Sequence, residues 1–152
     1  MKTYADESCR QEIRRRLNTI RPDSERRWGR MSAAQMICHL ADACRMALGE
    51  KAVSPASGPL RQTVVKWTAL YLPLPWPPGV LTRPEIDQQR SGTAPGDFAA
   101  DVQQVVVLLE RIASRDRRGL WPAHPIFGRM SARAWLRWTY LHADHHLRQF
   151  GA

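Results

Sequence analysis

The sequence predicts an all-α fold, a four-helix bundle with a long proline-rich crossover between the second and third helices. Two observations support this prediction. In four separate segments apolar residues recur at steps of three and four, the spacing of a helix face that packs into a core. The 152 residues, of which 43% are hydrophobic and 24% charged, also suit one globular domain spanning residues 1–152.

The first two helices are bounded by recognisable start and stop residues. The first has an apolar stripe within an arginine-rich run, formed by Ile13, Leu17 and Ile20. Pro22 ends it, because proline cannot continue a helix. The second begins at Ser32, whose partner in a capping box is Gln35, and it ends at Gly49.

The third and fourth helices follow in the C-terminal half. The third starts near Asp97, and its stripe alternates steps of four and three: Phe98, Val102, Val105, Leu109 and Ile112. The fourth runs from near Ser131 to about Phe150. Residues 28–33 (WGRMSA) are nearly repeated as residues 127–132 (FGRMSA), so helices two and four begin alike. The repeat indicates either equivalent places in a bundle or one helix entry used twice.

The connection from Lys51 to Gly96 holds eight of the eleven prolines. Residues 60–72 within it are expected to form a short helix, and the remainder to be irregular. Its aromatic residues argue against a flexible linker: Trp67, Tyr71 and Trp76. A connection of this length usually separates domains or has a function. We therefore expect it to pack across the bundle and wall off one end.

Cysteine usage and the N-terminus bear on the compartment. The three cysteines form no CxxC pair and one must remain unpaired, which argues against a disulfide scaffold. The N-terminal residues are charged and contain no apolar signal segment, so we expect a cytoplasmic protein. No apolar run reaches the roughly 18 residues of a membrane helix, so we expect no membrane partner.

The net charge of +9 favours anionic partners without choosing among them. A nucleic-acid-binding module is one alternative, because basic residues cluster at residues 14–16, 26–30 and 115–118. The clusters are scattered and interspersed with acids, and no known nucleic-acid-binding motif accompanies them. A solvated basic surface is the favoured explanation of them, and no specific nucleic-acid partner is expected.

The histidine pattern predicts a metal site. His142 and His146 are four residues apart and so lie one turn apart on one helix face, where both imidazoles can reach one ion. His39 lies seven residues after Ser32, and the other two lie eleven and fifteen after Ser131. On a helical wheel these steps fall within about 80° of one another. The three histidines are therefore predicted to face inward together and to hold a divalent metal, with zinc or nickel expected.

The neighbouring residues have competing interpretations. Asp42, one turn after His39, could be a fourth ligand, a hydrogen-bond acceptor for an imidazole, a general base or a solvated charge. His145 could replace one histidine of the pair, although its spacing to His142 is three. Cys38 points away and is expected to be buried and inert. His124 is expected to be structural or exposed, and Asp144 to face solvent. Each histidine could also be an ordinary core residue.

The stretches RWGRMSAAQMICHLADA and YLHADHHLRQF resemble the DinB-like superfamily, within its uncharacterised branch that carries HLAD in the second helix. PWPPGVLTRPEID is also similar to that branch, so the resemblance covers nearly the whole chain. It implies a four-helix bundle with a long crossover. It also implies a divalent metal bound by His39, His142 and His146, and dimers formed through bundle faces. The sequence departs from the usual Arg-Gly-Gln after the late motif, where it has Leu147-Arg148-Gln149.

Characterised members of that superfamily include thiol-dependent transferases and isomerases that use a low-molecular-weight thiol. The resemblance thus implies a metal-dependent thiol S-transferase acting on a small-molecule substrate. A metal-dependent hydrolase would use the same ligands, and a metal-binding protein without catalysis is a further alternative. Trp135 and Trp138 could wall a substrate pocket or serve only as bundle core.

Overall fold

The computed structural model describes residues 1–56, 60–80 and 82–152. Within these residues the fold is entirely helical, as predicted, and the only β-type pairing is an isolated bridge between His124 and Gly128. In chain order the helical segments are α1 (Glu7–Leu17), α2 (Ala33–Leu48), the π-helical η1 (Arg61–Val65), α3 (Lys66–Tyr71), the 3-10 turn η2 (Pro84–Ile86), α4 (Phe98–Ser114) and α5 (Ala132–Gln149).

The predicted helix starts are confirmed by their caps. Ser32 and Gln35 form a reciprocal capping box at the start of α2, in which each side chain accepts from the other residue's backbone N–H. Asp97 and Ser131 cap α4 and α5 by accepting from the backbone N–H three residues later. Gly49 ends α2 with a φ of 82°, the left-handed conformation that glycine adopts without steric cost.

The repeated hexapeptides adopt similar conformations before their helices. Gly29 and Gly128 both have positive φ angles, 79° and 64°. In each case the serine three residues later is the N-cap of the helix that follows. α2 and α5 are thus entered by similar turns, so positions in the two helices can be compared by counting from their N-cap serines.

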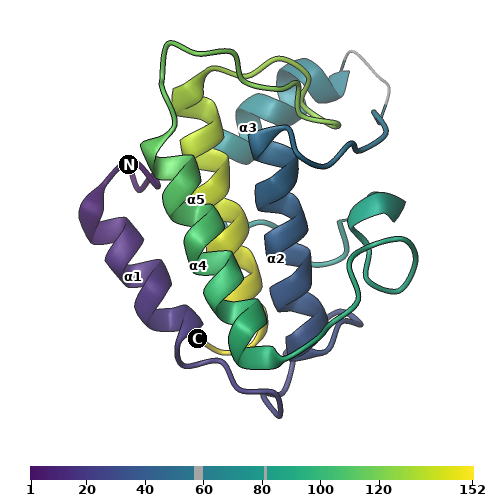
Figure 1. Cartoon of the computed structure of the whole chain (residues 1–152). Coiled ribbons are helices and arrows are strands. Elements are labelled where there is room, and N and C mark those ends of the chain that lie inside the picture. Colours follow the sequence, from purple (N-terminus) through teal and green to yellow (C-terminus); the bar gives the residue numbers. More distant parts are fainter. Residues whose placement is uncertain (57–59, 81) are drawn as a thin grey trace.

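The long helices lie side by side around one core (Figure 1). α2 packs against α4 and α5, and α1 packs against α5. α5 contributes Trp135, which is fully buried, and Leu147, which faces the core from the opposite end of the helix. Burial of apolar side chains from all four of these helices stabilises the arrangement.

The first helix ends earlier than its apolar stripe suggested. α1 stops at Leu17, and Ile20 lies beyond it but is still buried. Arg16 is also buried and donates to Asp144 at 2.7 Å, which joins α1 to α5. The expectation that Asp144 faces solvent is therefore wrong, because this carboxylate also pairs with Arg148 and is only 21% exposed.

The crossover contains the expected short helix, whose first half is π-helical and whose second half is α3. The crossover packs on the bundle, since α3 contacts α5 and η2 contacts α2. Trp76 is fixed by donating from Nε1 to the carbonyl of Ala69 at 2.7 Å. Residues 57–59 and 81 of the Lys51–Gly96 connection lie outside the described residues.

None of the helices in the described part of the chain is both long enough and apolar enough to cross a membrane. Cys9, Cys38 and Cys44 are all free, in agreement with the prediction of no disulfide scaffold. All three are buried, as was predicted for Cys38.

Candidate metal centre

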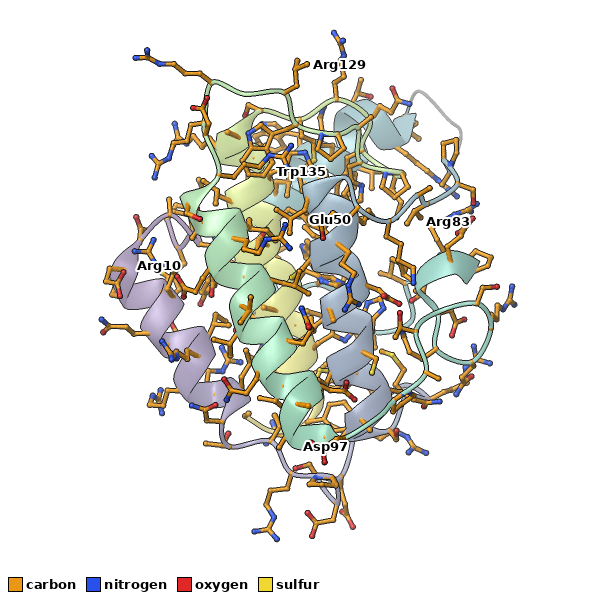
Figure 2. The ribbon with its side chains drawn as sticks, in the orientation of Figure 1. Arg10, Glu50, Arg83, Asp97, Arg129 and Trp135 are labelled. Atoms are coloured by element: carbon orange, nitrogen blue, oxygen red, sulfur yellow. The ribbon has the colours of Figure 1, made fainter. Side chains whose placement is uncertain are left out.

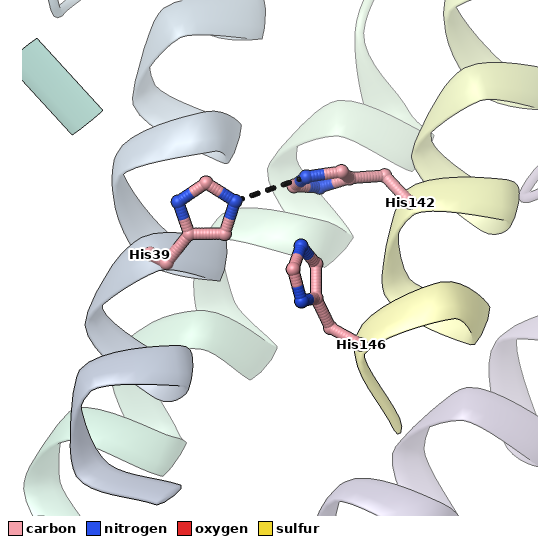
Figure 3. Close-up of side chains that lie close together, drawn as sticks. All are labelled: His39, His142 and His146. Carbon is pink, nitrogen blue, oxygen red and sulfur yellow. Dashed lines mark hydrogen bonds between the residues drawn. The ribbon is translucent and has the colours of Figure 1, made fainter. Parts of the chain in front are cut away.

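Three imidazoles converge between α2 and α5 (Figure 3). His39 extends from α2, and His142 and His146 extend from α5, where they lie one turn apart. One nitrogen from each lies within 4.8 Å of the others, and Nε2 of His39 is 3.1 Å from Nε2 of His142. Among the described residues these are the only three whose donor atoms form such a group. The predicted convergence of His39, His142 and His146 is confirmed.

The donor set fits a transition-metal ion. Metal–nitrogen bonds to histidine are about 2.0–2.1 Å long, so nitrogens around a tetrahedral ion are about 3.3–3.4 Å apart. The pair of Nε2 atoms at 3.1 Å is close to this separation. No two of the three nitrogens are more than 4.8 Å apart. To reach the separation around a tetrahedral ion, any pair needs to approach by at most about 1.5 Å, which rotation of the side chains can supply.

A backbone carbonyl sets the tautomer of His39. Nδ1 of His39 lies 2.7 Å from the carbonyl oxygen of Ile86, at the end of η2. Because a carbonyl only accepts, Nδ1 must carry the proton, and Nε2 is left with a lone pair directed at the other imidazoles. Such outer contacts orient metal-binding histidines and raise their basicity.

A relay through Gln149 sets the tautomer of His146 in the same way. The Nε2 group of Gln149 donates to the carbonyl of Trp28 at 2.8 Å, which leaves its Oε1 as an acceptor. That oxygen lies 2.9 Å from Nδ1 of His146. Nδ1 is therefore the protonated nitrogen, and the lone pair of Nε2 faces the other histidines (Figure 3).

His142 is oriented by stacking instead. Its ring lies 4.6 Å from that of Trp138 with an interplanar angle of 12°. Since Nε2 of His39 has no proton, Nε2 of His142 must be the donor in their 3.1 Å hydrogen bond. Metal binding at this nitrogen therefore requires the proton of His142 to move to Nδ1 or to leave.

Burial favours the neutral form of all three rings. It lowers the pKa of His39, and it is the main reason why the pKa values of His142 and His146 lie well below the ordinary value. The mutual repulsion of charged imidazoles lowers the pKa values of the last two further. Neutral imidazole is the form that binds a metal, so no charged imidazole has to be neutralised before an ion binds, although the proton of His142 must still leave Nε2.

The three histidines line a cavity of about 450 Å³. The crossover forms much of its wall, and the residues after α4 and the side chain of Trp138 complete it. The walls are mostly aliphatic and aromatic, as in Leu72, Val80, Trp76 and Phe127. No Asp or Glu is found among the described residues that line this cavity. The triad thus opens on an apolar space large enough for a small molecule.

Asp42 is placed one turn after His39 but has other partners. Its carboxylate accepts from the backbone N–H of Thr93 at 2.8 Å, from the Thr93 hydroxyl at 2.7 Å and from the Gln88 amide. Lys51 and Arg45 form ion pairs with the same group. Burial alone raises the pKa of Asp42, but the bonds from Thr93 and Lys51 prevail and hold it below its ordinary value. Asp42 therefore anchors the crossover. The acceptor for His39, one of the roles considered for Asp42, is the carbonyl of Ile86 instead.

The remaining candidates divide between structural and cavity-lining roles. His124 is buried and accepts at Nδ1 from the backbone N–H groups of Ile126 and Phe127, which confirms a structural role. Burial raises the pKa of the Cys38 thiol to about 11, as expected of an inert cysteine. Trp138 belongs to both the core and the cavity wall. His145 lines the cavity, and its buried Nδ1 has no hydrogen-bond partner in the described part of the chain.

The sequence did not reveal the groups that orient the ligands. Gln149 could have been found from its spacing, since it lies three residues after His146 and shares its helix face. The carbonyls of Ile86 and Trp28 leave no side-chain signal, because any residue supplies a carbonyl.

Two members of the basic clusters have internal partners instead of exposed positions. Arg16 pairs with Asp144, and Arg115 donates to the carbonyls of Leu48 and Leu120 while lying over the ring of Trp121. These contacts give the arginines structural roles and weaken the case for a continuous phosphate-binding surface.

The fold and site define a helical protein with three convergent histidines at an apolar cavity. Residues 6–152 match the family described as "Protein of unknown function (DUF1569)". The chain belongs to this family, because the match covers nearly its whole length. Comparisons with curated proteins and with solved structures gave no significant match.

Proposed function

We propose that the protein is a metal-dependent enzyme whose ion is held by His39, His142 and His146. The observation that carries this proposal is the opening of three convergent imidazoles onto an apolar cavity. Structural zinc sites are closed by four protein ligands, whereas catalytic sites keep a position for substrate. Zinc or nickel is the expected ion, since both accept imidazole ligands.

The reaction we propose is thiol S-transfer. The resemblance of HLAD and of YLHADHHLRQF to DinB-like sequences supports this choice, and we extend that relationship to the chain. The ion would supply Lewis-acid chemistry that lowers the pKa of a thiol at neutral pH. The thiol releases its proton to solvent, its sulfur forms a bond to an electrophilic carbon of the second substrate, and the leaving group departs with its electron pair.

The residues of the chain position and shield this reaction. Ile86 and Gln149 hold two imidazoles with their lone pairs directed inward. Trp138 fixes the third imidazole, and Trp76 lines the cavity from the crossover. The mostly apolar walls would favour a soft sulfur nucleophile over a water nucleophile. The free, buried cysteines support a reducing compartment such as the cytoplasm.

Hydrolysis at the same site is the second candidate, and one observation favours it. His145 lines the cavity, and its buried Nδ1 has no hydrogen-bond partner among the described residues. This nitrogen could take a proton from a water nucleophile, a role that Asp42 cannot fill because its oxygens are occupied.

Metal content tests the proposal first. Untagged protein is loaded with zinc or nickel, dialysed and measured by elemental mass spectrometry beside His142→Ala. His145→Ala is the matched control, because it removes a neighbouring imidazole of the same helix that is outside the triad. We expect about one ion per chain in the parent and the control, and little in His142→Ala. A parent that binds no ion would refute the proposal.

Activity distinguishes the two reactions. Zinc-loaded protein is incubated with a chromogenic aryl chloride, with and without a low-molecular-weight thiol. Release of chloride that depends on both thiol and metal supports S-transfer. Ester cleavage that needs no thiol and is lost in His145→Ala supports hydrolysis.

A further inference from the structure

One charged side chain lines the apolar cavity. Among the described lining residues Arg83 is the only Lys, Arg, Asp or Glu. It lies at the start of η2, on the α2 side of the molecule (Figure 2). All the other lining residues are apolar, hydroxyl-bearing or histidine. A guanidinium among apolar residues loses hydrogen bonds to water, and apolar neighbours cannot replace them.

The guanidinium of Arg83 has unused hydrogen-bonding capacity. Of its five N–H donors, one binds the hydroxyl of Ser54, while the buried Nε has no partner in the described part of the chain. No described carboxylate lies within the 4.0 Å of an ion pair. Glu85 forms no ion pair with it. A hydrogen bond with Ser54 is the largest cause that lowers the pKa of the Glu85 carboxyl, and the charge of Arg83 also contributes. Ser54 links the two residues as well, because its hydroxyl accepts from Arg83 and its backbone N–H donates to Glu85 at 3.1 Å.

The short turn η2 connects Arg83 to the candidate metal site. The backbone N–H of Ile86 donates to the carbonyl of Arg83 at 3.1 Å, and the carbonyl of Ile86 binds His39. Asp42 anchors the following residues through Thr93 and Gln88. The backbone of Arg83 is therefore held relative to His39, and the Arg83 side chain lines the same cavity as the histidine.

We infer that this cavity takes a substrate with an apolar body and one carboxylate, and that Arg83 binds the carboxylate. The inference rests on the proposed function only for the reaction at the histidines; the binding of the acid does not need a metal. A carboxylate matches the planar donor edge of guanidinium and can form the direct ion pair that Arg83 lacks among the described residues. One cation compensates a singly charged acid but not a phosphate dianion. The aliphatic and aromatic walls suit the rest of the molecule.

Calorimetric titration of metal-depleted protein tests the inference. The probes are ω-phenylalkanoates of increasing chain length and, as the uncharged counterpart of each, its primary amide. Removing metal with a chelator ensures that the carboxylate cannot bind an ion at the histidines. Arg83→Gln removes the charge, Arg83→Lys retains it, and Arg90→Gln is the matched control because Arg90 is on the same segment but exposed and outside the cavity.

We expect the best-fitting acid to bind the parent about 10–100-fold more tightly than its amide, as for hydrogen bonds to a charged group. Arg83→Gln should abolish this preference, Arg83→Lys should keep part of it, and Arg90→Gln should leave it unchanged. Equal binding of acid and amide, a preference that survives Arg83→Gln, or no binding of any chain length would overturn the inference. Glutathione serves as a polar carboxylated thiol. If glutathione binds through Arg83 and the phenylalkanoates do not bind, the inference that the substrate has an apolar body would be wrong.

The outcomes separate the two proposals. If the chain takes up no zinc but prefers the acid through Arg83, the metal-dependent enzyme falls and the anion site stands. If zinc binds and the acid preference is absent, the metal centre stands and the assignment of Arg83 falls.

Discussion

Replacing Gly29 by alanine should weaken zinc binding although Gly29 is not a ligand. Gly29 has a φ of 79°, and a Cβ at this position would lie 2.6 Å from Nε2 of Gln149. That separation is too short for non-bonded atoms, so Gln149 must rotate away. It would then lose its hydrogen bonds to the carbonyl of Trp28 and to Nδ1 of His146.

The magnitude follows from these two contacts. Loss of the group that orients a metal-binding histidine costs about 10–100-fold in metal affinity, which corresponds to about 1.4–2.7 kcal/mol. The left-handed backbone of Gly29 adds a separate cost in stability of about 1–2 kcal/mol when a side chain is introduced. Gln149→Leu should lower zinc affinity by a similar factor, and the double variant should add little, because both changes break one contact.

Gly49→Ala is the matched control. Its φ of 82° imposes the same backbone strain, but no atom lies within 4 Å of the added Cβ. Gly29→Ala should lose at least as much stability in urea as Gly49→Ala, because it also breaks the hydrogen bonds of Gln149. Only Gly29→Ala should bind zinc more weakly in competition with a chromophoric chelator. Equal zinc affinities of the two variants would refute the reasoning. The ¹⁵N shifts of His146 give an independent measurement, since the parent should show an unprotonated Nε2.

Two further predictions concern stability. Burial lowers the pKa of His124 to about 3, so the stability it contributes is present above pH 6.5 and is lost as the pH falls towards 3. The full difference in the free energy of unfolding is roughly 4–5 kcal/mol. His124→Asn retains a hydrogen-bond acceptor, so its free energy of unfolding should depend less steeply on pH than that of the parent. Parallel pH profiles of the two proteins would contradict this. Asp42→Asn should cost about 3–5 kcal/mol in urea unfolding, because it breaks buried ion pairs. The exposed Asp23→Asn should change little, and equal midpoints for the two variants would exclude an anchoring role for Asp42.

The sequence determined the helices and the identity of the triad, since both depend on local periodicity. Caps such as Ser32 and Ser131 and the stripe of α4 define helix starts and faces without long-range information. The spacing of His142 and His146 places them on one helix face. The position of His39, counted from the N-cap of its own helix, predicted that it faces them. The same reasoning failed for Asp144, because its partner Arg16 lies on another helix and is invisible to a single-helix wheel.

Only the tertiary structure decided what surrounds the triad. Asp42 shares a face with His39, yet Thr93 and Lys51 from the crossover occupy its carboxylate. The acceptor for His39 is a backbone carbonyl at Ile86, and the charge in the cavity is Arg83, both from a segment without helical periodicity. The physical reason is that local hydrogen bonds and burial select a helix face, whereas the path of an irregular segment depends on long-range contacts. Those contacts determine which groups complete the site.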